Sequence, residues 1–223
     1  MKSQDILLLF KIVSISMRDH LESEYLGRKH WQDWGREVEE DHGVDNDSYL
    51  DSIHLKAVPT YEDSISAQYS VRALAAETGI SKSQVSLALI RCYANGLASS
   101  DRMTEVPRVN TTAFGEFVVY GLKYVFPPAR GALTRGIGTA WAAPVLENAI
   151  LSGGETPLVW PDGRGNTKGQ ALDPIYKTVP MAVRKDPMLY NFLALTDSIR
   201  TGQAREKSAA ADLLIKALER RYV

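Results

Sequence analysis

Residues 69–97, YSVRALAAETGISKSQVSLALIRCYANGL, constrain the fold more than any other stretch of the chain. Small or apolar side chains recur there at i, i+3, i+4 and i+7 spacing in two short runs, the pattern of two amphipathic helices. The inward positions are Val71, Leu74, Ala75 and Thr78 in the first run and Val85, Ala88, Leu89 and Cys92 in the second. Gly79 lies between the runs and can adopt the positive φ that turns a chain sharply after a helix. The stretch therefore predicts two short helices joined by a tight turn.

The residues around this turn carry the signals of helix ends. Ile80 is placed to fill the core between the two helices, and Ser81-Lys-Ser-Gln84 has the form of a capping box for the second helix. Asn95-Gly96 is a C-cap signal at its end. Small Ala75, together with Gly79, permits the close approach that crossing helices require. The pattern is that of a helix-turn-helix whose second helix covers residues 81–95.

The run GISKSQVSLALIRCYANGLAS resembles the recognition helix and the start of the wing in bacterial winged-helix regulators of the MarR and GntR type. Those proteins share the pattern G-[IV]-S-x-x-[TV]-[VI]-S-x-x-L. The matching residues here are Gly79, Ile80, Ser81, Val85, Ser86 and Leu89. Val85 covers a position that the pattern fills with two residues, and Leu87 stands where members often carry Arg. The order of segments also resembles that of uncharacterised bacterial helix-turn-helix proteins. The resemblance implies a cytoplasmic DNA-binding transcriptional regulator.

On this resemblance, the outer side of the second helix and the hairpin that follows it contact double-stranded DNA. Residues 97–109 predict a wing of two short strands around a polar turn at Ser99–Arg102. The expected DNA-binding residues are Ser81, Lys82, Ser83, Gln84, Ser86, Leu87, Arg91, Arg102 and Arg108. Residues early in a recognition helix reach base edges, whereas wing arginines contact the backbone or the minor groove.

Each of these side chains has a chemical role in that interpretation. Gln84 would bond adenine and Leu87 would contact a thymine methyl group, while Lys82 and Arg91 would neutralise phosphates. One short helix contacts few base pairs, so a homodimer reading a palindromic site is expected.

A protein partner is the alternative ligand of the second helix. Leu87 and Ile90 form an outward apolar pair that fits a protein about as well as DNA. An antitoxin or adaptor without sequence-specific DNA binding therefore remains open. For Arg102 and Arg108, the alternative is that both are solvated surface residues.

Charge is nearly balanced over the 223 residues, with 26 basic and 27 acidic side chains, but it is unevenly distributed. Residues 17–64 hold 13 acidic against 5 basic side chains, so the remainder of the chain is mildly basic. That remainder suits contact with nucleic acid. We interpret residues 18–64 as an acidic insertion within a winged helix-turn-helix domain spanning 1–110.

The N-terminal residues 3–17 predict a strongly apolar helix with Ser3 as its N-cap. The run is too short for a membrane span and is interrupted by Lys11. We expect this helix to pack in the core or at a dimer interface, with no membrane as partner.

Residues 111–223 are expected to form a dimerisation or effector region. Asn110 caps a helix that is apolar nearly all round and ends at Pro127-Pro128. The Gly/Pro-rich residues 127–176 predict irregular loops and two short strands, PLVW and KGQAL, meeting across the turn 161–166. Three helices follow, starting near Pro180, at Asp186-Pro187 and near Ala204. The expected fold class is mainly α with a small β-wing and a helical C-terminal part containing a Gly/Pro-rich irregular segment.

Catalytic and metal-binding patterns are weak. Gly136-x-Gly138 lacks the third glycine of a dinucleotide site, although Arg130 and Arg135 nearby suit phosphate contact. His30 and His42 are far from the i, i+4 spacing of helical metal ligands. The single cysteine, Cys92, is predicted to be buried, with a redox sensor as the alternative. The sequence thus predicts no enzyme, metal or cofactor, and a site in the 127–176 loops is the remaining enzymatic alternative.

Overall fold

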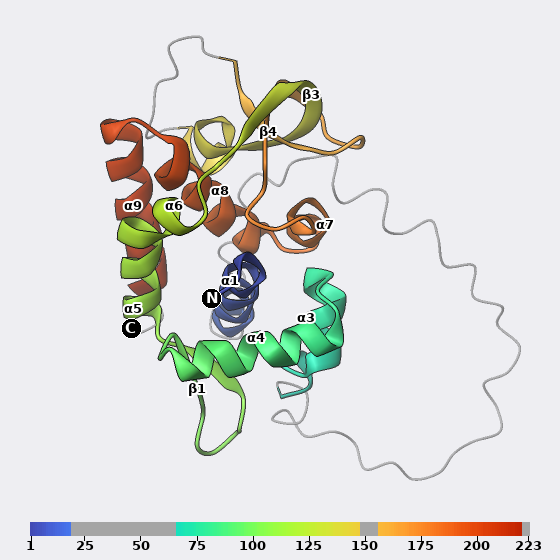
Figure 1. The fold of residues 1–223 in the computed structure, drawn as a ribbon, viewed down its shortest axis with the longest axis vertical. Helices are drawn as coiled ribbons and strands as arrows, with labels where there is room; N and C mark the ends of the chain where they lie inside the picture. The colour runs from blue at the N-terminus through green and yellow to red at the C-terminus, as the bar shows by residue number, and fades with distance from the viewer. Residues whose placement is uncertain (19–65, 148–155, 220–223) are drawn as a thin grey trace, which may run out of the picture.

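The computed structural model describes residues 1–18, 66–147 and 156–219, and this part of the chain is mainly helical with two small sheets (Figure 1). The predictions for the acidic insertion lie outside the described residues. The α-helices are α1 (Ser3–Arg18), α3 (Val71–Thr78), α4 (Lys82–Ala94), α5 (Thr111–Glu116), α6 (Leu122–Val125), α7 (Val179–Arg184), α8 (Pro187–Thr201) and α9 (Ala204–Glu219). The strands are β1 (Ala98–Ser100), β2 (Pro107–Val109), β3 (Arg130–Thr139), β4 (Leu158–Pro161) and β5 (Thr167–Leu172). Short helical turns are the π-helix η1 (Phe117–Gly121) and the 3-10 helices η2 (Ala140–Ala142) and η3 (Pro144–Leu146).

Helix α1 lies at the centre of the molecule, between α3 and α4 on one side and α8 on the other (Figure 1). Its apolar side chains are buried all round, as expected for a core helix. They are Ile6, Leu7, Leu8, Leu9, Phe10, Ile12, Val13 and Ile15. One hydrophobic cluster continues from α1 to Leu218 on α9. Residues on both sides of position 110 contribute to this cluster. Across the described ranges, no helix combines the length and apolarity needed to cross a bilayer.

The helix pair α3 and α4 matches the prediction in its turn and its C-cap. The Ser70 hydroxyl caps α3 by accepting from the Ala73 amide, and Gly79 ends this helix at φ 68°. Asn95 is the C-cap of α4, and Gly96 follows at φ 75°. The left-handed conformation of both glycines is the one that glycine adopts without strain.

The predicted capping box is wrong, although Ser81 is the N-cap residue. The Ser81 hydroxyl makes no bond to the amides of α4 and instead lies 3.3 Å from the Ser83 hydroxyl. The side-chain oxygen of Gln84, Oε1, accepts a hydrogen bond from Nε2 of Gln4 on α1 at 2.9 Å. The reason is tertiary: Gln4 is buried, and its amide donor needs a partner more than the exposed start of α4 does.

Strands β1 and β2 form the predicted antiparallel hairpin, with Ala98 opposite Val109. The turn lies over residues 101–106, later than the expected Ser99–Arg102. Asp101 explains the shift, because its carboxylate accepts from the Met103 and Thr104 amides at 2.9 and 3.0 Å. The bonds from Thr104 and Met103 hold the pKa of Asp101 below its ordinary value.

The helix after the hairpin begins as predicted, with the Asn110 side chain accepting from the Ala113 amide. It changes to π-helical hydrogen bonding in η1 before α6 continues it. Phe114, Val118, Val119 and Leu122 are buried, as expected for a helix with more than one buried side, whereas Tyr120 and Tyr124 are 71% and 74% exposed. A π turn uses i→i+5 bonds and so rotates the following residues out of α-helical register.

Strands β3, β4 and β5 close into a small barrel where irregular loops were expected. The strands PLVW and KGQAL exist and pair with each other, but in parallel rather than as the predicted hairpin across their turn. Both run antiparallel to β3, so that Gly136 pairs with Pro161 on β4 and with Thr167 on β5. The ten-residue strand β3 was missed because its glycines read as loop signals.

Those glycines serve the closure of the barrel. A Cβ atom on Gly136 would collide with the Trp160 carbonyl, and one on Gly169 would collide with the Pro157 carbonyl. Gly165 packs equally closely on the backbone of Gly136. Glycine here marks close approach of two backbones rather than a break in the strand.

A buried carboxylate fixes the barrel to α8. Asp197 accepts from Trp160 Nε1 at 2.6 Å, from the Thr139 hydroxyl at 3.0 Å and from Arg200 at 2.7 Å. Burial raises the pKa of Asp197, and Arg200 and the bonds from Trp160 and Thr139 oppose that rise. Arg200 also donates to the Phe126 carbonyl, which links the end of α6 to the same site.

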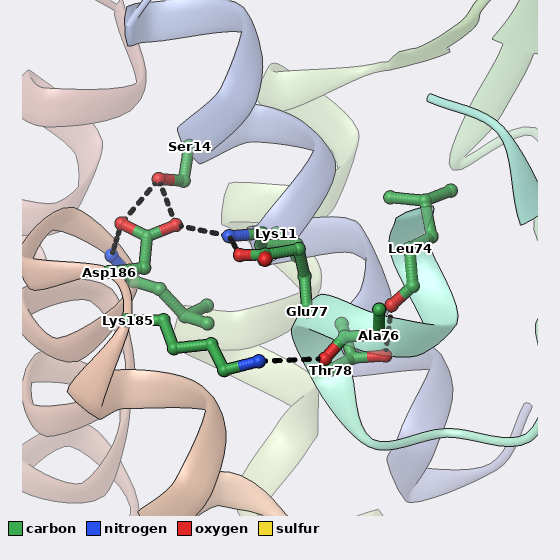
Figure 2. A network of polar contacts seen from close by, with 9 residues as sticks. Lys11, Ser14, Leu74, Ala76, Glu77, Thr78, Lys185 and Asp186 are labelled. Atoms are coloured by element: carbon green, nitrogen blue, oxygen red, sulfur yellow. Dashed lines mark hydrogen bonds and ion pairs between the residues drawn. The ribbon is translucent and has the colours of Figure 1, made fainter. Parts of the chain in front are cut away.

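A second buried network joins α1, α3 and α8 (Figure 2). Lys11 Nζ is fully buried and lies 2.9 Å from both Asp186 Oδ2 and Glu77 Oε2. Ser14 donates to the same Asp186 carboxylate. Asp186 is also the predicted N-cap of α8, since its Oδ1 accepts from the Leu189 amide at 3.1 Å. Lys11, which interrupts the apolar N-terminal run, is therefore the cation of a buried ion-pair network.

Replacing Lys11 by methionine should lower the free energy of unfolding by about 3–5 kcal/mol, because Asp186 then stays buried without its cation. Urea unfolding measures this change. Adding Asp186→Asn should recover part of the loss, because asparagine keeps the helix cap without the charge. Lys2→Met at an exposed position is the control, expected within about 0.5 kcal/mol of wild type. Equal effects of Lys11→Met and Lys2→Met would contradict the buried pair.

Gly136→Ala should lower the free energy of unfolding by about 1–3 kcal/mol, because the new Cβ meets the Trp160 backbone rather than a movable side chain. Gly163→Ala is the matched control: nothing lies within 4 Å of its Cβ, so it should be neutral or stabilising by up to about 1 kcal/mol. Thermal unfolding of the two variants compares them directly. A stable Gly136→Ala protein would mean that the barrel strands do not approach this closely.

Candidate nucleic-acid interface

The outer side of α4 and the hairpin after it form the surface that the sequence assigned to DNA. Val85, Ala88 and Cys92 are buried on the inner side of α4, toward α1 and α3. The hairpin follows the C-terminal end of α4; β2 contacts α1, and the tip of the hairpin projects away from the helices (Figure 1). Within the described part of the chain, Lys82, Ser83, Leu87 and Ile90 are exposed on the opposite side of α4.

The first turn of α4 is exposed and polar. Ser81, Lys82 and Ser83 are exposed, and Ser86 is half-buried with its hydroxyl donating to the Lys82 carbonyl at 3.2 Å. Lys82 takes part in no ion pair with the described residues. These four residues have the placement that the sequence predicted for them, at the start of an open helix.

Arg91 was predicted to lie free on the outer face of α4. It is instead bound to α1. Its Nε and NH2 groups donate to the two carboxylate oxygens of Asp5 at 3.0 and 2.6 Å. Asp5 is fully buried, and the bond to it raises the pKa of Arg91. A bidentate pair neutralises the cation and orients it away from a phosphate. The signal that could have shown this is Asp5 itself, a carboxylate at the start of an otherwise apolar helix.

Gln84 is also partly engaged. Its oxygen accepts from Gln4, so the paired donor and acceptor that an adenine edge requires are not both free.

The hairpin presents its two arginines differently. Arg102 is exposed in the 101–106 loop, whereas Arg108 Nε lies 3.5 Å from Asp101 Oδ2 with its side chain 38% exposed. The structure therefore leaves Arg102 available and offsets the charge of Arg108.

An apolar stripe runs along the outer side of α4, formed by Leu87, Ile90 and Tyr93. These side chains are 47%, 61% and 37% exposed. The sequence predicted the first two as an outward apolar pair, and Tyr93 extends the stripe by about one further turn. The face is consequently polar at the start of α4 and apolar toward its end.

The charges around this surface are modestly positive. Among residues 66–110 the exposed cations Arg72, Lys82 and Arg102 have no acidic partner in the described structure. Glu77 is turned toward Lys11, and Asp101 toward Arg108. Glu105 in the 101–106 loop is exposed as well, so this surface carries three unpaired cations against one exposed carboxylate, and its charge favours an anion.

Within the described ranges, no group of three or more His, Cys, Asp or Glu side chains is placed to hold a metal ion. His30 and His42 lie outside those ranges. Comparisons with family models, with curated proteins and with solved structures found no match.

Cys92 is buried, as predicted, on the inner side of α4. Burial, reinforced by the Asp5 carboxylate, raises the pKa of its thiol to about 12. A thiol with such a pKa is almost entirely protonated at neutral pH and is a poor nucleophile.

The folded protein should therefore react with Ellman's reagent at about pH 8 orders of magnitude more slowly than the guanidinium-unfolded chain, which releases one equivalent. The absorbance of the released thiolate measures both rates. Rapid reaction of the folded protein would revive the redox-sensor alternative.

Proposed function

We propose that this chain is a DNA-binding transcriptional regulator in which α3, α4 and the β1–β2 hairpin form a winged helix-turn-helix. One observation carries the proposal: the exposed polar start of α4 lies in a surface whose exposed cations, Arg72, Lys82 and Arg102, lack acidic partners among the described residues. Helix N-termini in such motifs contact base edges while flanking cations contact phosphates.

The roles proposed for individual residues follow from their contacts. Lys82 and Arg102 neutralise phosphates, and the hydroxyls of Ser81 and Ser83 bond bases or phosphates. Leu87 contacts a thymine methyl group. Arg91 acts through Asp5 to fix α4 against α1, which makes it a positioning residue rather than a phosphate ligand.

A homodimer on a palindromic site completes the proposal, because a 13-residue helix reaches too few base pairs alone. The helix after the hairpin offers a surface for the second copy. Tyr120, Tyr124 and Val125 are 71%, 74% and 52% exposed there, and exposed aromatic and apolar side chains of this kind support self-association.

A protein-interaction module is the second candidate function, and the apolar stripe favours it. Leu87, Ile90 and Tyr93 give the outer side of α4 an exposed apolar stripe, and the pairing of Arg91 removes one expected phosphate contact. Helix-in-groove recognition uses apolar anchors at this spacing. An adaptor or antitoxin would use the same helix without reading DNA.

The Lys82→Gln/Arg102→Gln variant should weaken binding to all duplex sequences and reduce the slope of log K against log salt by about 2. Fluorescence anisotropy of a labelled duplex between about 50 and about 300 mM salt measures both quantities. Gln84→Ala should leave the salt slope unchanged. If the double variant binds duplex DNA like wild type, the proposed docking is wrong.

The Leu87→Ser/Ile90→Ser variant separates the two functions. The regulator is supported if the wild-type protein binds DNA in a salt-dependent way and the serine variant loses only its sequence preference. Absence of any DNA binding by wild type at low salt favours the adaptor.

A further inference from the structure

Three cations meet at one corner of the β3–β4–β5 barrel, and we call Arg135, Arg164 and Lys168 the basic corner. Arg135 on β3 lies directly opposite Lys168 on β5 in the antiparallel register. Arg164 lies in the loop between β4 and β5. The next residue, Gly165, packs on the backbone of Gly136, which follows Arg135. The backbone positions of the three cations therefore lie close together.

No carboxylate of the described residues neutralises the basic corner. All three side chains are exposed and take part in no ion pair with the described chain. The charge of the nearby Asp162 is paired with Arg184, whose NH2 lies 3.1 Å from Asp162 Oδ2. The other oxygen, Oδ1, accepts from the Arg164 backbone amide at 2.8 Å. Like charges directly opposite each other on paired strands are unfavourable. An anion bound between them would relieve this repulsion.

The corner is built on a rigid part of the fold. The strands approach so closely that Gly136 and Gly165 leave no room for a Cβ atom. Beneath them, Trp160 and Tyr190 pack edge to face, and Trp160 donates to Asp197. The backbone positions that carry the cations are thus fixed before any ligand arrives, which lowers the entropic cost of binding.

We propose that the basic corner binds the phosphate backbone of duplex DNA without reading its bases. The strands of the barrel carry no exposed aromatic side chain among their described residues, so they lack the stacking platform of a single-strand binder. Leu133 is their single large exposed apolar side chain, too little for insertion into a lipid surface. Cations spaced along paired strands suit adjacent phosphates.

This contact lies far from α4. In Figure 1 the barrel and α4 occupy opposite ends of the molecule, with α1 and α8 between them. The basic corner therefore holds a stretch of duplex other than the one that α4 contacts. The inference rests on the proposed DNA-binding function and adds a second, sequence-independent contact to it.

Arg135→Gln/Lys168→Gln tests the basic corner by removing the opposed pair. We expect its affinity for a short duplex of arbitrary sequence to fall at least about tenfold at about 100 mM salt, and its salt slope to fall by about 2. Arg205→Gln/Lys216→Gln is the matched control, because it removes one exposed arginine and one exposed lysine from α9. This control should bind like wild type. Circular dichroism should show a melting temperature no lower than that of wild type for Arg135→Gln/Lys168→Gln, since the substitution removes a repulsion.

Each outcome decides the inference separately from the proposed function. A loss in Arg135→Gln/Lys168→Gln alone, or in both it and Lys82→Gln/Arg102→Gln, supports the basic corner. Unchanged binding by Arg135→Gln/Lys168→Gln overturns the corner even if Lys82→Gln/Arg102→Gln is defective. Equal losses in the α9 control overturn it as well, because they would reflect total charge only. Loss of binding to phosphatidylglycerol vesicles with DNA binding intact assigns the corner to a lipid surface and overturns the DNA contact.

Discussion

The buried ion pair between Lys11 and Asp186 is the interaction on which the rest of the structure depends. Its lysine belongs to the mainly apolar helix α1. The pair joins α1 to the start of α8, while Glu77 ties α3 to the same ammonium group. Removing two charges from water costs several kcal/mol per ion, which only good geometry and further hydrogen bonds repay. Here Ser14 and the Leu189 amide supply those bonds. An apolar α1 could rotate about its axis or slide within its surroundings, whereas this pair permits one alignment.

Buried ion pairs also join other elements of the fold. Asp5 is buried beside Arg91 and fixes α4 against α1, and Asp197 is buried beside Arg200 and fixes the barrel against α8. Each carboxylate is saturated with donors, so each defines a geometry rather than merely adding stability. The candidate DNA surface inherits its position from this arrangement, because α4 is aligned on α1 and its turn contacts α7 through the bond from Thr178 to the Thr78 carbonyl. The outer residues of α4 determine what the helix can bind, whereas its buried contacts determine its orientation.

Local signals predicted much of the fold and less of the site. The turn at Gly79, the end at Asn95-Gly96 and the caps at Asn110 and Asp186 follow from short-range backbone chemistry, and all are present. Strand β3 was not predictable in this way, because its glycines are required by a strand pairing that only the closed barrel reveals. The role of Arg91 was missed for a related reason: its partner lies 86 residues away, so helical periodicity placed the residue on the open face. Lys82 and Arg102, which have no distant partner in the described chain, lie where the pattern placed them.

The sequence separation within the buried network has a consequence for synthesis of the chain. Lys11 and Asp186 are 175 residues apart, yet neither is tolerable in the core without the other. At bacterial or eukaryotic rates of translation, roughly 10–35 s pass between the appearance of these two residues at the ribosome. During that interval α1 has its apolar sides and its lysine but lacks α8. A nascent chain that ends before α8 therefore cannot close its core, and this protein must complete its folding late, after most of its length has emerged.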